Sequence, residues 1–69
     1  MSDKLSLGQQ VDIALIKANK KQVELVEELK SEGVEINYTV FSTKKKYNAF
    51  DEREISAINK VLKSEIKIN

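Results

Sequence analysis

Neither cysteine nor histidine occurs in this chain of 69 residues. No disulfide can therefore form within it, and the nitrogen and sulfur ligands of a structural zinc site are missing. A domain of this size buries only about 60% of the surface that its unfolded chain exposes. Apolar packing must therefore stabilise the fold, with any further help coming from a partner molecule. The length allows one domain, residues 1–69.

The composition favours helices. The chain has no proline and only two glycines, while the good helix formers Ala, Leu, Lys, Glu and Gln dominate it. The longest apolar cluster, Ile13–Ile16, is far too short to cross a bilayer. Residues 1–10 are polar and carry charges of both signs, unlike a secretory signal peptide. These features predict an all-α protein of the cytoplasm.

The first apolar run predicts a helix at about residues 7–18. Ser6 followed by Gln9 has the form of a capping box at its start. Ile13 and Ile16 widen the apolar surface, so we expect this helix to be buried on more than one side. The residues that define its main face recur at spacings of three and four: Leu7, Val11, Ala14, Leu15 and Ala18.

A second run predicts a helix at about residues 21–31. Asn19 and Gln22 repeat the cap-plus-three spacing before it. Gly33 follows it and can end a helix by adopting a left-handed conformation. The apolar residues of this run are Val23, Leu25, Val26 and Leu29.

Residues 34–41 fit two descriptions. Val34, Ile36, Tyr38 and Val40 alternate with other residues, as in a strand. Asn37, however, is a favoured helix N-cap, and Ile36 and Phe41 are spaced as a hydrophobic staple around a helix start. A single strand without a partner strand would also be hard to satisfy. We therefore expect a helix at about residues 37–46.

The fourth helix, at about residues 52–64, has the clearest start. Asp51 and Glu54 form a capping box, and Phe50 and Ile55 form a staple across it. Its inward stripe consists of Ile55, Ile58, Val61 and Leu62. The tail, residues 65–69, is compatible with a strand, a helix extension or a frayed end.

The formal net charge is only +1, so a nucleic-acid partner would require positive charge to be concentrated locally. Two basic groups are separated by an acidic stretch. The basic groups are Lys17, Lys20 and Lys21, and Lys44, Lys45 and Lys46; the acids between them are Glu24, Glu27, Glu28, Glu32 and Glu35.

No enzymatic activity is expected. The chain lacks histidine, cysteine and a glycine-rich phosphate loop, and its carboxylates follow helix surfaces. Capping explains Asp51 and Glu54 better than acid–base chemistry does. We expect no cofactor and no metal ion.

Two segments resemble a known DNA-binding motif. Lys21-Gln22-Val23-Glu24-Leu25-Val26 stands where the Cro/CI-type (XRE-like) helix-turn-helix family of phage and mobile-element regulators has Thr-Gln-x-Glu-Leu-Ala. Residues 36–42, Ile-Asn-Tyr-Thr-Val-Phe-Ser, are similar in type to that family's Val-Ser, three variable residues and Ile-Ser. The resemblance covers about residues 5–63. It implies a compact four-helix, lambda repressor-like domain with a helix-turn-helix and a possible short C-terminal extension.

The chain departs from the family pattern at three places. The turn at residues 30–35 is longer, Val26 replaces the family's alanine, and Lys46-Tyr47-Asn48 replaces the Asn-Gly that ends the third helix. All three bear on the angle at which the third helix would be presented.

The resemblance implies a sequence-specific transcriptional regulator whose helix at about residues 37–46 enters the major groove of a double-stranded operator. Tyr38 and Thr39 would face the bases, and Ser42 and Thr43 would reach a phosphate or a base edge one turn later. Gln22 would contact a phosphate and brace this helix. The implied DNA-binding residues are Gln22, Asn37, Tyr38, Thr39, Ser42, Thr43, Lys45 and Lys46, with Lys20, Lys21 and Lys44 as further phosphate contacts.

Simpler roles remain open for several of these residues. The lysine run is also typical of a solvated helix end, where cations favour the helix dipole. Tyr38 is also compatible with a core position, Gln22 with a capping role, and Asn37 with a cap rather than base contact.

Besides DNA, two protein partners are compatible with the sequence: a second copy of the chain and a larger repressor protein. We expect a homodimer on a pseudo-palindromic site, with the interface around Ile58, Leu62, Ile66 and Ile68. The alternative function is that of an antirepressor or modulator that binds a larger repressor protein, which the near-neutral charge and the acids of residues 24–35 favour. An excisionase-like architectural factor is less favoured because no basic hairpin is evident.

Overall fold

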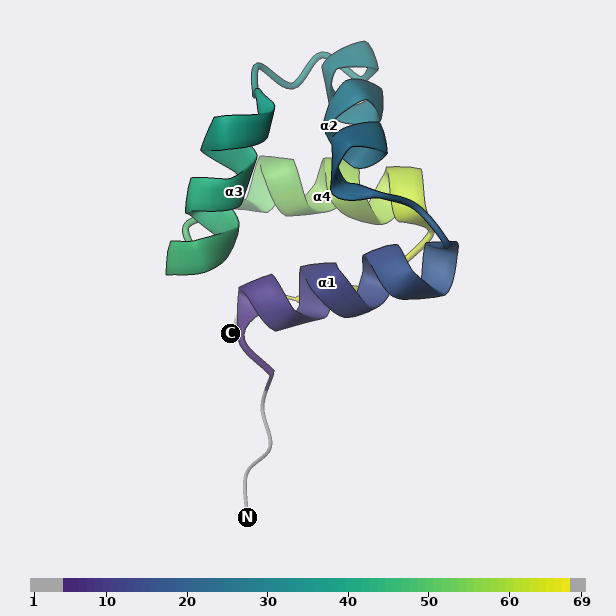
Figure 1. Cartoon of the computed structure of the whole chain (residues 1–69), viewed down its shortest axis with the longest axis vertical. Helices are drawn as coiled ribbons and strands as arrows, with labels where there is room; N and C mark the ends of the chain where they lie inside the picture. Colours follow the sequence, from purple (N-terminus) through teal and green to yellow (C-terminus); the bar gives the residue numbers. More distant parts are fainter. Residues whose placement is uncertain (1–4, 68–69) are drawn as a thin grey trace.

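The computed structural model describes residues 5–67, which form four α-helices and no strand. They are α1 (Leu7–Ala18), α2 (Gln22–Ser31), α3 (Tyr38–Tyr47) and α4 (Glu52–Leu62) (Figure 1). The expected all-α, four-helix domain is thereby confirmed. Every helix begins and ends within two residues of its expected position, and the segment that also fitted a strand enters helix α3.

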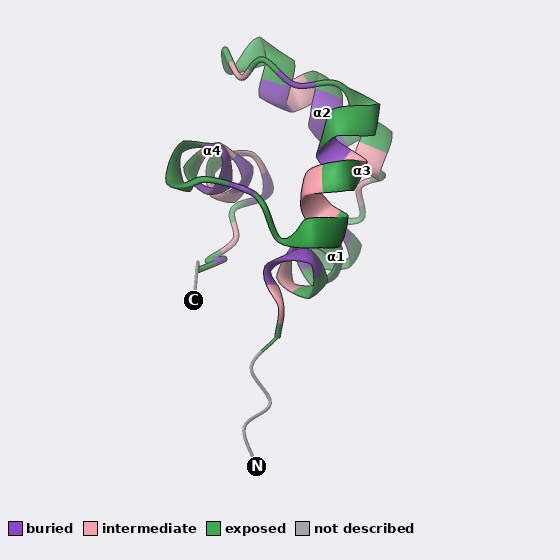
Figure 2. Ribbon diagram, turned by 90° about the vertical axis from the view of Figure 1, so that its left-hand side faces the viewer, coloured by how far each residue is buried: buried purple, intermediate pink, exposed green. Residues whose placement is uncertain are grey.

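The four helices enclose one core. In Figure 1, α2 and α3 run up and down the page, while α1 and α4 run across it. Helix α2 packs against α4 and α3, and α1 packs against α3 and α4. The rings of Phe41 and Phe50 lie 5.0 Å apart between their centroids. The largest fully buried side chains are Phe41, Leu25, Leu29, Ile58, Val11 and Val26, and Figure 2 shows how the buried parts of the helices turn inward.

Most helix starts follow the expected capping chemistry. Ser6 Oγ accepts from the N–H of Gln9, and the capping box of Asp51 and Glu54 is complete. Asn37 caps α3, with Oδ1 accepting from the N–H of Val40 at 2.8 Å. These contacts satisfy N–H groups that the first turn of a helix cannot satisfy itself.

The expected role of Asn19 as the cap before α2 is wrong. Asn19 ends α1 in the left-handed conformation (φ 55°), and its N–H donates to Ile16 and Leu15 carbonyls. Helix α2 starts instead after Lys21, whose N–H donates to Glu24 Oε1 at 2.8 Å. Asparagine is favoured both as an N-cap and in the left-handed C-terminal position, so the sequence alone did not separate the two roles.

The connection from α2 to α3 accounts for the first half of the alternating pattern, Val34 and Ile36. Gly33 turns the chain with φ +89°. Val34 is then half-buried and Ile36 is buried in the core. Val34 and Ile36 therefore alternate because they attach the connection to the core, whereas Tyr38 and Val40 belong to α3, which begins two residues after Ile36.

Burial overturns two expectations. Ile13 and Ile16 are exposed, Ile16 by 77%, so α1 is not buried on more than one side. Ile58, Leu62 and Ile66 are core residues of the monomer and are not free to form the expected dimer interface. Ile68, the fourth residue of that interface, lies outside the described residues, as does Asn69.

The tail as far as Lys67 is neither helix nor strand, and it closes over the core. Helix α4 stops at Leu62, two residues before its expected end, because Lys63 adopts the left-handed conformation. The Asn59 side chain bonds both backbone groups of Ile66, at 2.8 and 3.0 Å, and accepts from Ser64 Oγ. Contacts to a single half-buried polar side chain leave no periodic signal in a sequence.

Candidate nucleic-acid interface on α3

Helix α3 is amphipathic in an unusual way, with one apolar anchor and a polar outer face. Phe41 is completely buried. Thr39, Thr43 and Lys46 are exposed, and their spacing of four and three places them along the outer side. Tyr38 is 52% exposed at the start of the helix. It is therefore not a core residue, which resolves one of the alternatives left open by the sequence.

Gln22 connects α2 to α3. Its Nε2 donates to Ser42 Oγ at 2.7 Å, and its Oε1 accepts from Lys45 Nζ at 2.7 Å. Lys45 Nζ also lies 2.8 Å from Asp12 Oδ1 of α1. The sequence-derived residues Gln22, Ser42 and Lys45 are thus brought together, and the bracing contact expected of Gln22 is present.

The three consecutive lysines of α3 have different surroundings. Lys44 is paired with the Glu54 carboxylate of α4, and Lys45 is paired with Asp12 of α1. Lys46 forms no ion pair with another residue in the range 5–67; its Nζ lies 5.5 Å from the ring centre of Tyr47. The positive charge that α3 offers to solvent is therefore mainly that of Lys46.

The lysines before α2 also differ in their surroundings. Lys20 Nζ lies 2.8 Å from Glu28 Oε1, and this hydrogen bond raises the pKa of Lys20 above its ordinary value. Lys17 and Lys21 are exposed. Lys21 lies at the N-terminal end of α2, where the helix dipole favours anions.

The remaining predicted site residues are separate from this network. Asn37 is exposed but its side-chain oxygen is engaged in capping α3. Thr43 Oγ1 donates to the carbonyl of Thr39 at 3.0 Å, while the Thr39 side chain is exposed and makes no hydrogen bond with the described residues. Asn37 and Thr39 therefore lie at the exposed N-terminal end of α3, close to Tyr38 in the chain.

Sequence reasoning missed three residues that position α3: Asp12, Gly8 and Asn48. Gly8 lies so close to α3 that a Cβ atom at residue 8 would be 2.4 Å from the Lys45 carbonyl oxygen. Its N–H donates to Asn48 Oδ1 at 3.0 Å, and Asn48 ends α3 in the left-handed conformation. A glycine inside a helical pattern is the one signal that could have indicated this close approach.

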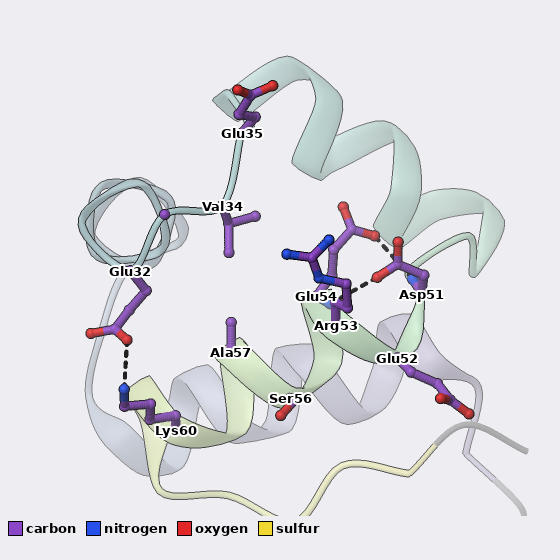
Figure 3. A pocket seen from close by; sticks show the side chains of 11 residues that line it. Glu32, Val34, Glu35, Asp51, Glu52, Arg53, Glu54, Ser56, Ala57 and Lys60 are labelled. Carbon is purple, nitrogen blue, oxygen red and sulfur yellow. Dashed lines mark hydrogen bonds and ion pairs between the residues drawn. The ribbon is translucent and has the colours of Figure 1, made fainter.

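A cleft of about 860 Å³ lies between the α2–α3 connection and α4, and acidic residues from both segments line it (Figure 3). Glu32 and Lys60 form an ion pair of 2.8 Å at one end, and this hydrogen bond raises the pKa of Lys60. Glu54 is buried and accepts from the N–H of Asp51. The charged residues that line the cleft are Glu32, Glu35, Asp51, Glu52, Arg53, Glu54 and Lys60.

Within residues 5–67, no group of three or more acidic side chains is arranged to hold a metal ion. None of the helices in this range combines the length and the apolar character needed to cross a membrane. Comparisons with models of protein families, with curated proteins and with solved structures find no match to this chain.

Proposed function

We propose that this protein is a small sequence-specific DNA-binding transcriptional regulator that acts in the cytoplasm and presents α3 to the major groove. The observation that carries the proposal is that α3 exposes Tyr38, Thr39 and Thr43 while Gln22 holds the same helix from α2. A groove-reading helix needs both an open polar face and a fixed orientation.

The chemistry of the exposed residues suits this role. The N-terminal residues of a recognition helix meet base edges, and Thr39 offers a hydroxyl together with a methyl group that fits a thymine methyl. Tyr38 adds a hydroxyl and a flat apolar face. Lys46 and Lys21 are exposed and would bind phosphates, which would position the protein without reading the sequence.

The proposed DNA-bound state is a homodimer. One monomer offers only a short stretch of α3 to the bases, so a second copy on the other half of a pseudo-palindromic site would supply the rest of the specificity. The dimer surface must lie outside the core residues Ile58, Leu62 and Ile66.

The proposal is tested by selecting duplexes from a random-sequence library with the purified protein and then measuring affinity against salt. We expect enrichment of a two-fold symmetric sequence and a log–log salt slope of about −0.9 for each phosphate neutralised. Failure of repeated selection to enrich any sequence would refute the proposal.

A second candidate function is binding to a larger repressor protein. The observation that favours it is an apolar edge on α3, where Val40 and Tyr47 are two turns apart and Tyr47 is 67% exposed. The pairing of Lys44 and Lys45 with carboxylates also reduces the attraction to phosphate.

The two functions differ in their response to a Tyr47→Ala variant. A repressor complex that uses this edge would be lost, because an exposed aromatic residue is a common anchor at protein interfaces. DNA binding through the opposite edge and outer face would be retained. The measurement is co-purification with repressor proteins alongside binding of the selected duplex.

A further inference from the structure

We infer that Lys45 is a positioning residue that fixes the orientation of α3, and that it does not bind phosphate. It belongs to a three-helix clasp, which we define as Asp12 of α1, Gln22 of α2, and Ser42 and Lys45 of α3. The inference rests on the proposed function for its DNA-binding consequences, while the clasp itself can be tested without DNA.

The ammonium group of Lys45 is already engaged on two sides. It donates to Asp12 Oδ1 at 2.8 Å and to Gln22 Oε1 at 2.7 Å. An ammonium has three N–H donors, so two of them are used, and the Asp12 carboxylate compensates the charge. The Lys45 side chain is only 25% exposed. Binding a phosphate would require it to leave a carboxylate that it already holds.

The same contact orients Gln22. Because its carbonyl oxygen faces the Lys45 ammonium, its amide nitrogen is directed to Ser42, which it reaches at 2.7 Å. Removing the ammonium would leave the amide free to rotate and would weaken the Ser42 contact as well. One lysine thus supports two connections between α2 and α3.

The backbone of Lys45 contacts α1 independently of its side chain. Its carbonyl oxygen lies only 2.4 Å from the position that a Cβ atom on Gly8 would occupy. Gly8 and Asp12 are four residues apart and therefore share one face of α1. This face holds Lys45 through the close backbone approach at Gly8 and through the ion pair at Asp12.

Lys46 provides a matched comparison within the same helix. It is the next residue, it is exposed, and it has no carboxylate partner among residues 5–67. If the inference is correct, Lys45→Met and Lys46→Met should weaken DNA binding in different ways although both remove one positive charge.

The first experiment measures the affinity of both variants for the selected duplex and for an unselected duplex over a range of salt. Lys45→Met should lower affinity for the selected duplex about tenfold, as expected for losing hydrogen bonds to a charged group. It should leave the salt slope and the binding of unselected DNA unchanged. Lys46→Met should weaken both duplexes and reduce the slope by about 0.9.

Asp12→Ala separates two possible roles of Asp12, because they predict opposite changes in the affinity for DNA. If Asp12 only held Lys45 back from a phosphate, its removal would strengthen binding and steepen the salt slope. The clasp predicts weaker binding of the selected duplex despite the loss of a negative charge. A Lys45→Met variant that reduces the slope as Lys46→Met does, or an Asp12→Ala variant that binds more tightly, would overturn the inference and leave the proposed function standing.

The clasp is tested without DNA by urea unfolding of Asp12→Ala, Lys45→Met and the double variant. The two changes should be non-additive, with the double variant losing less stability than the two single variants together, because each removes the same interaction. Strict additivity would overturn the inference. This result is independent of DNA, so a protein that fails to bind any duplex would refute the proposed function alone.

Discussion

Gly8 lies directly against Lys45, with room for a hydrogen atom but not for a methyl group: a Cβ at residue 8 would be 2.4 Å from the Lys45 carbonyl oxygen. This contact joins the first turn of α1 to the last turn of α3. The position of the proposed recognition helix therefore depends on the absence of a side chain in another helix.

Gly8→Ala should destabilise the protein. The methyl group must displace backbone, so the cost should lie in the upper part of the range of about 1–3 kcal/mol for overpacking, above the gain of about 1 kcal/mol from the better helix propensity of alanine. The measurement is the free energy of unfolding in urea. Ser56→Ala introduces alanine at an exposed position of α4 and should change stability by less than about 0.5 kcal/mol. Equal effects of the two changes would contradict the packing described here.

Asn19→Ala should cost about 1 kcal/mol, because alanine lacks the short polar side chain that lets asparagine tolerate the left-handed conformation that ends α1. Asn19→Gly should be nearly neutral, since glycine adopts this conformation freely. If Asn19 instead capped α2, Asn19→Ser would be nearly neutral, because serine is as good an N-cap as asparagine. In the left-handed position that ends α1, serine should cost about as much as alanine. Thermal unfolding of the three variants therefore distinguishes the two roles by whether serine behaves as glycine does or as alanine does.

Asn59→Ala should release the tail from the core. The variant loses both contacts to the Ile66 backbone and the contact to Ser64, and a hydrogen bond left unmade at a half-buried site costs about 1–3 kcal/mol. Amide hydrogen exchange at Ile66 should become faster. Ser64→Ala removes only one of these contacts and should leave the exchange of Ile66 largely protected. Unchanged exchange in Asn59→Ala would show that the burial of Ile66 and the hydrogen bonds of Gln10 to the Lys67 backbone hold the tail without Asn59.

Thr39→Ala should weaken binding of the selected duplex about tenfold and leave unselected DNA unaffected, because a contact to a base edge discriminates between sequences. Ser56→Ala, on α4, serves as the control and should bind both duplexes as the wild type does. An equal loss on both duplexes would remove Thr39 from base recognition.

Stability should fall with rising pH above about 10.4, the ordinary pKa of lysine. Hydrogen bonds to Glu28 and Glu32 raise the pKa values of Lys20 and Lys60 in the folded state. Their contribution is complete below the unfolded-state pKa and is lost as the pH rises through the folded-state values. The double variant Lys20→Met/Lys60→Met should show a shallower alkaline decline in urea unfolding. Lys46→Met, which removes a lysine without a carboxylate partner, should retain the wild-type decline.

The helices could be predicted because their signals are local. Asn37, between the staple residues Ile36 and Phe41, marks the start of α3 within a few residues of sequence, and Asp51 and Glu54 do the same for α4. The exposure of Ile16 could not be predicted, since it lies beside a true core face and its exposure depends on where the other helices stop.

The candidate site was predictable in part for the same reason. The resemblance implied that Gln22 braces the third helix, and Gln22 does contact α3, although the resemblance did not name its partner there, Ser42. It gave no indication that Asp12, from a third helix, pairs with Lys45, because a single exposed aspartate on an amphipathic helix has no distinctive local pattern. Contacts between distant segments depend on the packing, which the periodicity of one helix does not specify.

Three adjacent lysines on α3 suggest a strong attraction for a polyanion, yet Glu54 and Asp12 lie against two of them. Long-range steering depends on the field of the whole surface, and compensated charges contribute little to it beyond the screening length of about 8 Å at physiological salt. The protein should therefore meet a charged partner at close to the rate set by undirected diffusion, and its selectivity would arise after encounter, from how long the complex lasts.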